Sequence, residues 1–362
     1  MKIVLLLILV PVGLFTLYVV SMLVFGTITD WQPPETELIS VQNPRDAAPA
    51  DSVFTFVTWN VGYGGLGAQS DFFYDAGGGM VTANGAMVRS SAEQVEEYTA
   101  GIVRELFGMR GTDFVLLQEV DRDAKRSHGT DQFTLFGEQA LDEHERSHAL
   151  NYNARFVPIP LLHPSPLGRV RSGLATYSAY ATYDATRHQF PGNFPWPTRI
   201  FMLDRCFLSH RVPLPSGKEL VVVNSHNSAY DDGTLKQQQM RHLNDFLEAE
   251  YATGNYVVVG ADWNQCPPGF AYDSFSQENA DDYHQTNIPA DDLPAGWTWA
   301  YDPTVPTNRK LATPYNPGET FVTLIDFFLV SPNVEVLEVE GIDLGFAMSD
   351  HQPVRLKVRL LP

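Results

Sequence analysis

Basic residues are scarce in this sequence of 362 residues. There are 24 lysines and arginines against 43 aspartates and glutamates, which gives a formal net charge of −19 at pH 7. This acidity argues against a protein whose affinity comes from a broad basic face on duplex DNA. A nuclease is not excluded, because bound divalent cations offset negative charge locally.

Cysteine is rarer still, with only Cys206 and Cys266. The two residues fit no metal-binding spacing. A disulfide in an oxidising compartment and two separate buried thiols are both open. Low-complexity tracts and internal repeats are also lacking, and 44% of the residues are hydrophobic. The chain can therefore form one large core or two modest ones, with disorder expected only in short linkers.

The long apolar run of the sequence, Ile3 to Ile28, lies at its N-terminus. About 20 residues span a bilayer, whereas the apolar core of a signal peptide has about 7–15. No clear cleavage site follows the run, and no cysteine is present there for lipid attachment. We predict a transmembrane signal anchor over residues 1–29, uncleaved rather than a cleaved signal peptide, with the rest of the chain outside the cytoplasm. The proline-rich segment 30–51 is predicted to be a stiff linker that holds the domain off the membrane.

Residues 52–362 contain more predicted strands than helices. Strands are expected at 53–60, 113–120, 153–159, 172–180, 200–212, 219–226, 256–259, 323–331 and 352–360. Helices are expected from a capping signal at Ser90–Glu93, over 131–148, and from Thr234 to Gly254. Loops are expected at 62–85, 184–197 and most of 267–319. This mixture of connections favours an α/β sandwich of mixed sheets with helices outside.

The stretch Tyr256–Gln265 is the centre of the predicted site. Its first four residues are an apolar run bounded by Gly260, which is typical of a strand buried on both faces. Asp262 and Asn264 follow two residues apart, so the period of a strand directs both side chains the same way. Such a pair can hold a metal-bound water or a phosphate oxygen. An Asx-rich turn closing a core strand is the alternative.

Polar side chains also stand at the ends of other predicted strands. They are Asn60, Glu119, His226 with Asn227, Asp262 with Asn264, and Asp326, and Ser349–His351 precedes the last strand. One acid at a strand end carries little information. Five strand ends with complementary chemical types are hard to explain as independent capping residues, so we expect these side chains to form one site.

In order along the chain, these motifs resemble those of the endonuclease/exonuclease/phosphatase superfamily. The matching stretches are Thr58–Asn60, Leu117–Val120, Asn224–His226, Gly260–Asn264, Leu324–Phe328 and Ser349–Val354. Asn227 and Trp263 depart from the residues common in the family, but neither departure removes a functional side chain. The resemblance, over about residues 54–360, implies the deoxyribonuclease-I-like fold, a four-layer α/β/β/α sandwich of two mixed sheets flanked by helices.

The resemblance also implies a Mg²⁺-dependent phosphoester hydrolase, with Mn²⁺ or Ca²⁺ as alternative metals. Glu119 is the expected metal ligand, because Mg²⁺ keeps several waters and takes only one or two protein carboxylates. Asn60 would bond within the metal and phosphate site, and Asp350 would serve a second metal or a water. A helix-capping or salt-bridged role is the alternative for Glu119.

Five residues are implied in catalysis. Asp262 would orient and deprotonate the attacking water, and Asn264 would hold water or phosphate. His351 would contact the phosphate, with its tautomer fixed by Asp326. His226 would be the general acid for the leaving oxygen.

Further residues are weaker candidates for substrate binding. Asn227 and Arg309 are assigned to it, together with Arg199 and Arg205, because a guanidinium matches phosphate oxygens well. Surface salt bridging is the alternative for the three arginines. Tyr177 is expected to be a packing residue, and six histidines that match no motif are expected to be structural or superficial: His128, His144, His148, His163, His188 and His210.

The substrate remains open between classes. Acidity and the membrane anchor favour a phospholipid or a small phosphodiester, and an extracytoplasmic endo- or exonuclease is the alternative. A basic groove around Arg199 and Arg309 would favour nucleic acid, and an apolar rim from Phe190, Phe194, Trp196 and Trp297 would favour lipid. A catalytically silent, membrane-tethered binding protein is the alternative of another class. We expect a monomeric catalytic domain in a bacterial envelope.

Overall fold

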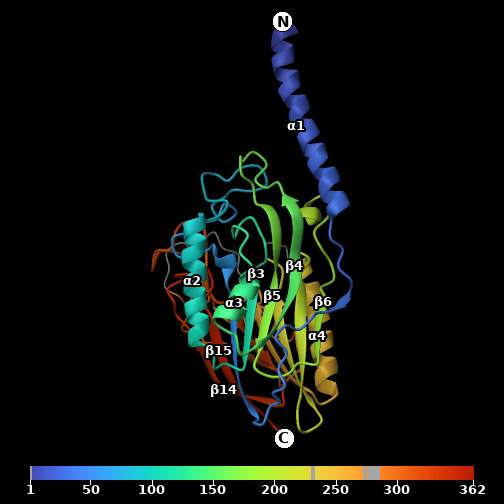
Figure 1. The fold of residues 1–362 in the computed structure, drawn as a ribbon, viewed down its shortest axis with the longest axis vertical. Helices are drawn as coiled ribbons and strands as arrows, with labels where there is room; N and C mark the ends of the chain where they lie inside the picture. The colour runs from blue at the N-terminus through green and yellow to red at the C-terminus, as the bar shows by residue number, and fades with distance from the viewer. Residues whose placement is uncertain (1, 230–232, 272–274, 276–285) are drawn as a thin grey trace.

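The structure is a computed structural model that describes residues 2–229, 233–271, 275 and 286–362. Two β-sheets face each other, and helices cover their outer sides (Figure 1). The arrangement is the predicted four-layer α/β/β/α sandwich. α1 (Lys2–Thr29) projects from one end of the domain, and the C-terminus lies at the opposite end.

The first sheet has seven strands. In spatial order they are β1 (Thr36–Leu38), β6 (Asp184–Gln189), β7 (Cys206–Pro213), β8 (Glu219–His226), β9 (Tyr256–Asp262), β13 (Asp326–Val330) and β10 (Thr298–Ala300). β8 and β9 pair in parallel, and the other neighbours pair antiparallel. α4 (Thr234–Ala252) covers this sheet and places Met240, Leu243 and Leu247 in its outer core.

The second sheet has six strands. In spatial order they are β14 (Val334–Gly341), β15 (Val354–Leu360), β2 (Val53–Asn60), β3 (Phe114–Asp121), β5 (Gly168–Ser178) and β4 (Glu145–Val157). β2 and β3 pair in parallel. α2 (Ala92–Gly108) and α3 (Gln132–Gln139) cover its outer side, where they pack on Trp59 and Leu117. Phe56, Val222 and Phe328 belong to the core between the sheets.

Several predicted boundaries are wrong. The helix predicted over 131–148 ends at Gln139, and β4 begins at Glu145, where burial alternates as in a strand with one covered face. The predicted loop at 184–197 contains β6, whose polar sequence hid its pairing with β1 and β7. β14 was not predicted either. The capping box of α2 joins Ser91 and Gln94, one residue later than expected.

The long connection 267–319 is only partly a loop. It contains β10 and β11 (Asn308–Arg309), and β11 pairs with β12 (Val322–Thr323) beside the main sheets. Residues 272–274 and 276–285 of this connection lie outside the described residues. The two cysteines are separate buried thiols, so the disulfide alternative is excluded.

The segment 30–51 runs along the domain. Its strand β1 forms the edge of the seven-stranded sheet by pairing with β6. The centre of the Trp31 ring lies 5.1 Å from Cζ of Arg187, and the side-chain Nδ2 of Asn43 donates to the backbone carbonyl of His144 at 2.8 Å. The segment is extended, as its prolines predict, and backbone groups of β1, Ile39 and Gln42 form hydrogen bonds with the rest of the domain.

Candidate active site

The site lies at one end of the sandwich, where strands of both sheets finish. Asn60 ends β2, His226 ends β8 and Asp262 ends β9. Asp326 begins β13, which runs antiparallel to β9, so the register places it opposite Asp262. The parallel pairing of β8 and β9 likewise places His226 opposite Asp262. Sheet register thus brings together residues that are far apart in sequence.

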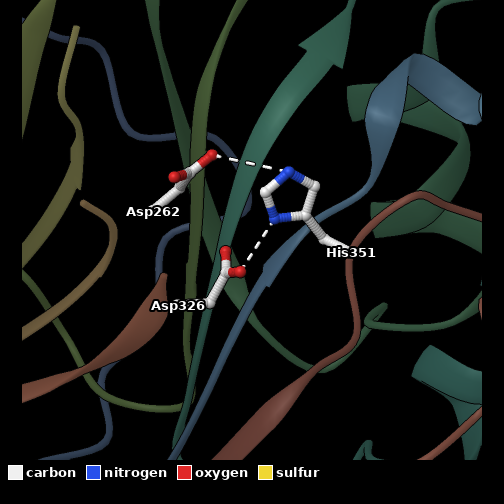
Figure 2. Close-up of side chains that lie close together, drawn as sticks. All are labelled: Asp262, Asp326 and His351. Carbon is white, nitrogen blue, oxygen red and sulfur yellow. Dashed lines mark hydrogen bonds and ion pairs between the residues drawn. The ribbon is translucent and has the colours of Figure 1, made fainter. Parts of the chain in front are cut away.

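His351 lies between two carboxylates, as Figure 2 shows. Its Nδ1 is 2.8 Å from Asp326 Oδ2, and its Nε2 is 3.8 Å from Asp262 Oδ2. Burial disfavours the charged imidazole, but the charges of Asp326, Asp262 and Asp350 outweigh it and raise the pKa of His351 well above the usual range. The three carboxylates therefore favour the protonated form of the ring.

His226 has the opposite electrostatic balance. Its Nε2 is 3.2 Å from Asp262 Oδ2. Burial lowers the pKa of the His226 imidazole well below its usual value, and the positive charge of Arg205 lowers this pKa further. His226 is therefore neutral at pH 7. Burial opposes ionisation of Asp262, yet His226, His351 and Asn60 together lower the pKa of this carboxyl. The centre of the site is a carboxylate between one neutral and one protonated histidine.

Asn60 connects this centre to Glu119. Its Nδ2 donates to Asp262 Oδ2 at 2.8 Å and lies 3.4 Å from Glu119 Oε1. Its Oδ1 accepts from the backbone N–H of Gly62 at 2.9 Å. Asn60 is 1% exposed and lies behind the cavity wall. Its position orients the two carboxylates.

Glu119 reaches the site because of a bulge in β3. Pairing with β5 shifts register between Leu117 and Val120, and Glu119 has φ of 55°. Leu117 and Val120 both pack in the core under α2, although a regular strand would put residues three apart on opposite faces. The extra residue frees Glu119 from that core and turns it into the cavity.

A second group of charges surrounds Glu119. Arg126 lies 3.6 Å from Glu119 Oε2, 2.9 Å from Asp121 Oδ1 and 3.7 Å from the centre of the Tyr63 ring. Burial, followed by the negative charge of Glu119, raises the pKa of Asp350 to about 6 against the opposing charge of His351. Two carboxylates that repel each other in a buried cavity are the donors expected for a hard cation.

The residues offer two sets of metal donors. Glu119 and Asp350 are the carboxylates of the predicted metal site, and both line the cavity. Asp262, Asp326 and His351 form a buried cluster whose potential ligand atoms lie within 4.8 Å of one another. In the second cluster Nδ1 of His351 already bonds to Asp326, so the first set is the more available one. The donor chemistry fits a divalent cation.

One large cavity of about 1220 Å³ contains the site. Six residues predicted to act in chemistry line it: Glu119, His226, Asp262, Asn264, Asp350 and His351. Asn264 has φ of 51°, and its backbone N–H donates to Asp262 Oδ1 at 3.0 Å, which is an Asx turn. The same two residues also line the cavity, so the turn and the functional position are not alternatives here. Asp326 lies behind His351.

Two predicted substrate contacts are engaged with other parts of the protein, although Arg309 borders the cavity and Asn227 does not. Arg309 is 1% exposed, and its guanidinium donates to backbone carbonyls of Leu66, Gly67 and Ser70 at 2.8–3.2 Å. Asn227 is fully buried, and its Nδ2 points to Met240 Sδ at 3.2 Å. Both side chains are engaged in packing, so the structure does not support direct substrate contact by either.

Other predicted residues have mixed positions. Arg205 lines the cavity, whereas Arg199 is 45% exposed and lies 3.8 Å from Asp30. Phe194 lines the cavity and Trp196 is exposed, but Phe190 and Trp297 pack in the core under α4, so the predicted apolar rim is only half present. The six histidines assigned structural roles lie outside the described wall of the cavity, and Tyr177 packs in the core under α2.

The sequence interpretation missed two cavity residues. Asn308 Nδ2 lies 3.0 Å from Nε2 of His351, and Arg126 forms the ion pairs described above. Asn308 belongs to the short β11 inside a region predicted as loop, and Arg126 follows β3 by a few residues with no motif around it. Neither residue carries a local signal: Asn308 acquires its role from His351, which is distant in sequence, and Arg126 acquires its role from the acids at the end of β3.

Comparison with known proteins agrees with this geometry. The model of the endonuclease/exonuclease/phosphatase family matches residues 57–351. Among solved structures, an endonuclease/exonuclease/phosphatase from Beutenbergia cavernae is 18% identical with a TM-score of 0.56, covering 86% of this chain and 72% of that chain. TDP2 of D. rerio, complexed with a single-strand DNA product, is 15% identical with a TM-score of 0.51, covering 85% and 100%. The human nocturnin catalytic domain, with bound sulfate, is 13% identical with a TM-score of 0.51, covering 89% and 97%.

No curated protein matches the sequence. The structural likenesses, all at low identity, establish the fold, and the family match extends over most of the chain with the site residues inside or at its limits. The chain therefore belongs to the endonuclease/exonuclease/phosphatase family, whose members are hydrolases that act on phosphoesters.

Proposed function

We propose that this protein is a divalent-metal-dependent phosphodiester hydrolase, anchored by α1, with a monomeric catalytic domain on the extracytoplasmic side of a bacterial envelope. The observation that carries the proposal is the cavity in which Glu119, Asp350, His226, Asp262 and His351 meet. A carboxylate pair for a cation, a carboxylate next to space for water, and two histidines of opposite charge state are the groups that phosphoester hydrolysis needs.

We assign Glu119 and Asp350 as the carboxylates that hold the metal, with Asn60 orienting Glu119. Mg²⁺ is the expected ion, with Mn²⁺ and Ca²⁺ as alternatives. When bound, such an ion neutralises charge on the phosphate oxygens. Arg126 already offsets part of the charge on Glu119, which limits the number of cations that the site needs.

The protein residues supply the rest of the reaction. Asp262 orients a water and accepts one of its protons while the water oxygen bonds to phosphorus. The ester bond to the leaving alcohol breaks, and that oxygen receives a proton, so that the products are a phosphomonoester and an alcohol. His351, held by Asp326, faces the phosphate as a cation.

His226 is the candidate donor of the proton to the leaving oxygen. It is neutral in the free site, because burial lowers its pKa. A nearby negative charge favours the protonated form of an imidazole. We therefore expect the bound phosphate itself to promote protonation of His226, so that the acid forms only in the loaded site.

A phospholipid or a small phosphodiester is the favoured substrate. The net charge of −19 opposes binding to a polyanion. The guanidinium of Arg309, one of the two arginines of the predicted basic groove, is also occupied by backbone carbonyls. A nuclease is the second candidate, and the likeness to TDP2, solved with a single-strand DNA product, is the observation that favours it. A silent binding protein is disfavoured because no predicted catalytic side chain is missing from the sequence.

The test uses the full-length protein in detergent, with bis-(p-nitrophenyl) phosphate, sphingomyelin and plasmid DNA as substrates. We expect turnover with Mg²⁺, loss of turnover with EDTA, and a fall of about 10²-fold or more in His351→Ala. Glu119→Gln should need more Mg²⁺ for half-maximal activity. The surface variant His242→Ala is the matched control and should behave as the wild type. Turnover that is indifferent to EDTA and to His351→Ala would refute the proposal.

A further inference from the structure

The last turns of α1 lie against the catalytic domain. Residues 3–17 are exposed on every side, whereas Leu23 is partly buried and Gly26 is buried. A Cβ at Gly26 would lie 2.9 Å from Ile200 Cδ1, so the close approach to η2 (Thr198–Phe201) depends on the missing side chain. The indole of Trp196 donates to Thr27 Oγ1 at 3.1 Å.

This packing limits how far the domain can stand from a bilayer. At 1.5 Å per residue, the freely exposed part of α1, residues 3–17, is roughly 22 Å long. The hydrocarbon core of a bilayer is about 30 Å thick. If α1 spans the membrane, the turns around Leu23 therefore lie at its outer boundary, and so do the parts of the domain packed beside them.

Two uncharged loops of the domain lie at that end. They are residues 76–88, after β2, and residues 156–168, which connect β4 to β5, and neither contains Asp, Glu, Lys or Arg. Both extend on the side from which α1 projects (Figure 1). The backbone N–H groups of Leu161 and Leu162 donate to the carbonyls of Met80 and Val81 at 2.8 and 3.0 Å, so the two loops are joined.

The joined loops expose large apolar side chains. Met80, Val81 and Leu162 are 45%, 50% and 61% exposed, and Trp196 at the base of α1 is 56% exposed. In a chain with a net charge of −19, two loops without Asp, Glu, Lys or Arg are notable because they can enter a membrane interface with little charge to desolvate. The adjoining Arg89 donates to the carbonyls of Ser165 and Pro166 in the second loop. Exposed apolar residues with a tryptophan are typical of interfacial contact.

The same loops lead into the catalytic cavity. A single apolar cluster joins Val88 of the first loop and Phe73 just before that loop to Ile159 and Leu167 of the second loop. Phe201 of η2 and the partly buried Leu23 of α1 belong to the same cluster. Met80, Ile159, Leu167 and Phe201 also line the cavity that the catalytic residues line. The cavity thus has room for an apolar body beside a phosphoester.

We propose that the cavity opens toward the bilayer that holds α1, with Met80, Val81, Leu162 and Trp196 in the interface, and that it takes a membrane phospholipid from that bilayer. The inference rests on the proposed function and specifies its substrate class. The lipid phosphodiester lies at the catalytic end and the start of its hydrocarbon at the apolar end. Because the domain is acidic, we expect a zwitterionic lipid rather than an anionic one.

The first test measures position without activity. Full-length Leu162→Cys is labelled with an environment-sensitive fluorophore and reconstituted into phosphatidylcholine vesicles. Native Cys206 and Cys266 are buried, so the label is selective. We expect a blue-shifted emission that is quenched by spin-labelled lipid. Leu337→Cys, on β14 at 38% exposure, is the matched control and should be quenched by aqueous iodide instead. Equal iodide quenching at the two sites would overturn the docking.

The second test compares substrates in the same vesicles. Met80→Ser/Leu162→Ser should lower the ratio of sphingomyelin or phosphatidylcholine turnover to bis-(p-nitrophenyl) phosphate turnover by about tenfold or more, since two large apolar side chains leave the interface. Leu337→Ser should keep the wild-type ratio. An unchanged ratio in the double variant, or hydrolysis of the soluble ester and plasmid DNA without any lipid, would overturn the inference and leave the hydrolase. Failure to hydrolyse any of these esters would instead refute the proposed function, and the label would still decide the docking.

Discussion

Asp326 acts on the site through His351. It is fully buried, and its Oδ2 lies 2.8 Å from Nδ1 of the histidine. This contact fixes the ring so that Nε2 is directed to Asp262 and Asn308. A carboxylate behind an imidazole sets its tautomer and orientation. The residue is thus a positioning residue, separated from the cavity by the histidine that it holds.

Asp326→Asn should therefore lower kcat by about 10²-fold or more, because the amide leaves the ring without its charged partner. The KM for bis-(p-nitrophenyl) phosphate should change little, since Asp326 does not line the cavity. Steady-state kinetics of the detergent-solubilised protein measures both constants. The control is Asp343→Asn, on the surface. A raised KM with kcat intact would contradict this role.

At the scale of elements, Arg309 joins two loops beside the site. Its guanidinium donates to carbonyls of Leu66, Gly67 and Ser70 in the loop after β2, and its other nitrogen approaches the carbonyls of Lys310 and Thr313. Burial lowers the pKa of Arg309, but the side chain stays charged. The planar, forked donor can reach several carbonyls at once, which an ammonium group cannot.

Arg309→Lys should lower the free energy of unfolding by about 2–4 kcal/mol, because several buried carbonyls lose their donor and the remaining charge is poorly paired. Urea denaturation followed by tryptophan fluorescence measures the change. Arg355→Lys is the matched control, because Arg355 is a half-exposed partner of Glu340 on the surface, and a change within about 0.5 kcal/mol is expected there. Equal effects of the two substitutions would contradict the assigned role.

At the scale of the whole molecule, histidines in different layers of the sandwich resist protonation: His210 lies between the sheets, His148 lies against α3 and His188 lies against α4. His210 on β7 contacts Ser147 Oγ on β4 through Nε2, which links the two sheets. Burial lowers the pKa of His210 to about 3. Burial likewise lowers the pKa values of His148 and His188 to about 4. Each of these side chains is neutral in the folded protein and gains a proton on unfolding in mild acid.

The contribution of these three histidines to stability should therefore fall as the pH decreases below about 6.5, the ordinary pKa of histidine, because the unfolded chain then binds protons that the folded side chains exclude. Each such histidine contributes about 1.4 kcal/mol per pH unit until its folded pKa is reached. His210→Gln should reduce this slope between pH 6.5 and pH 5, as measured by urea denaturation across the range. The exposed His128 is not among the charges that act on these three histidines, so His128→Gln should keep the wild-type slope. A slope unaltered by His210→Gln would refute the prediction.

The architecture and the main site residues could be predicted because their signals are local. Short apolar runs that end in Asn60, His226 and Asp262 predict both a buried strand and the polar side chain at its C-terminal end. Where local pattern and tertiary pairing disagree, prediction fails. The polar residues 184–189 form a strand because β1 and β7 supply partners for them, and the polar segment from Glu145 continues a sheet although it resembles a helix.

The sequence by itself determined the family, the order of the strands that bear the site and the chemical types of its side chains, since these depend on residue identity and short-range periodicity. Only the tertiary structure decided where several side chains point. It buried Arg309 against carbonyls as far away as Leu66, turned Glu119 into the cavity through a bulge, and joined the end of α1 to the apolar half of that cavity. Burial and charge pairing depend on neighbours distant in sequence, and no local pattern records them.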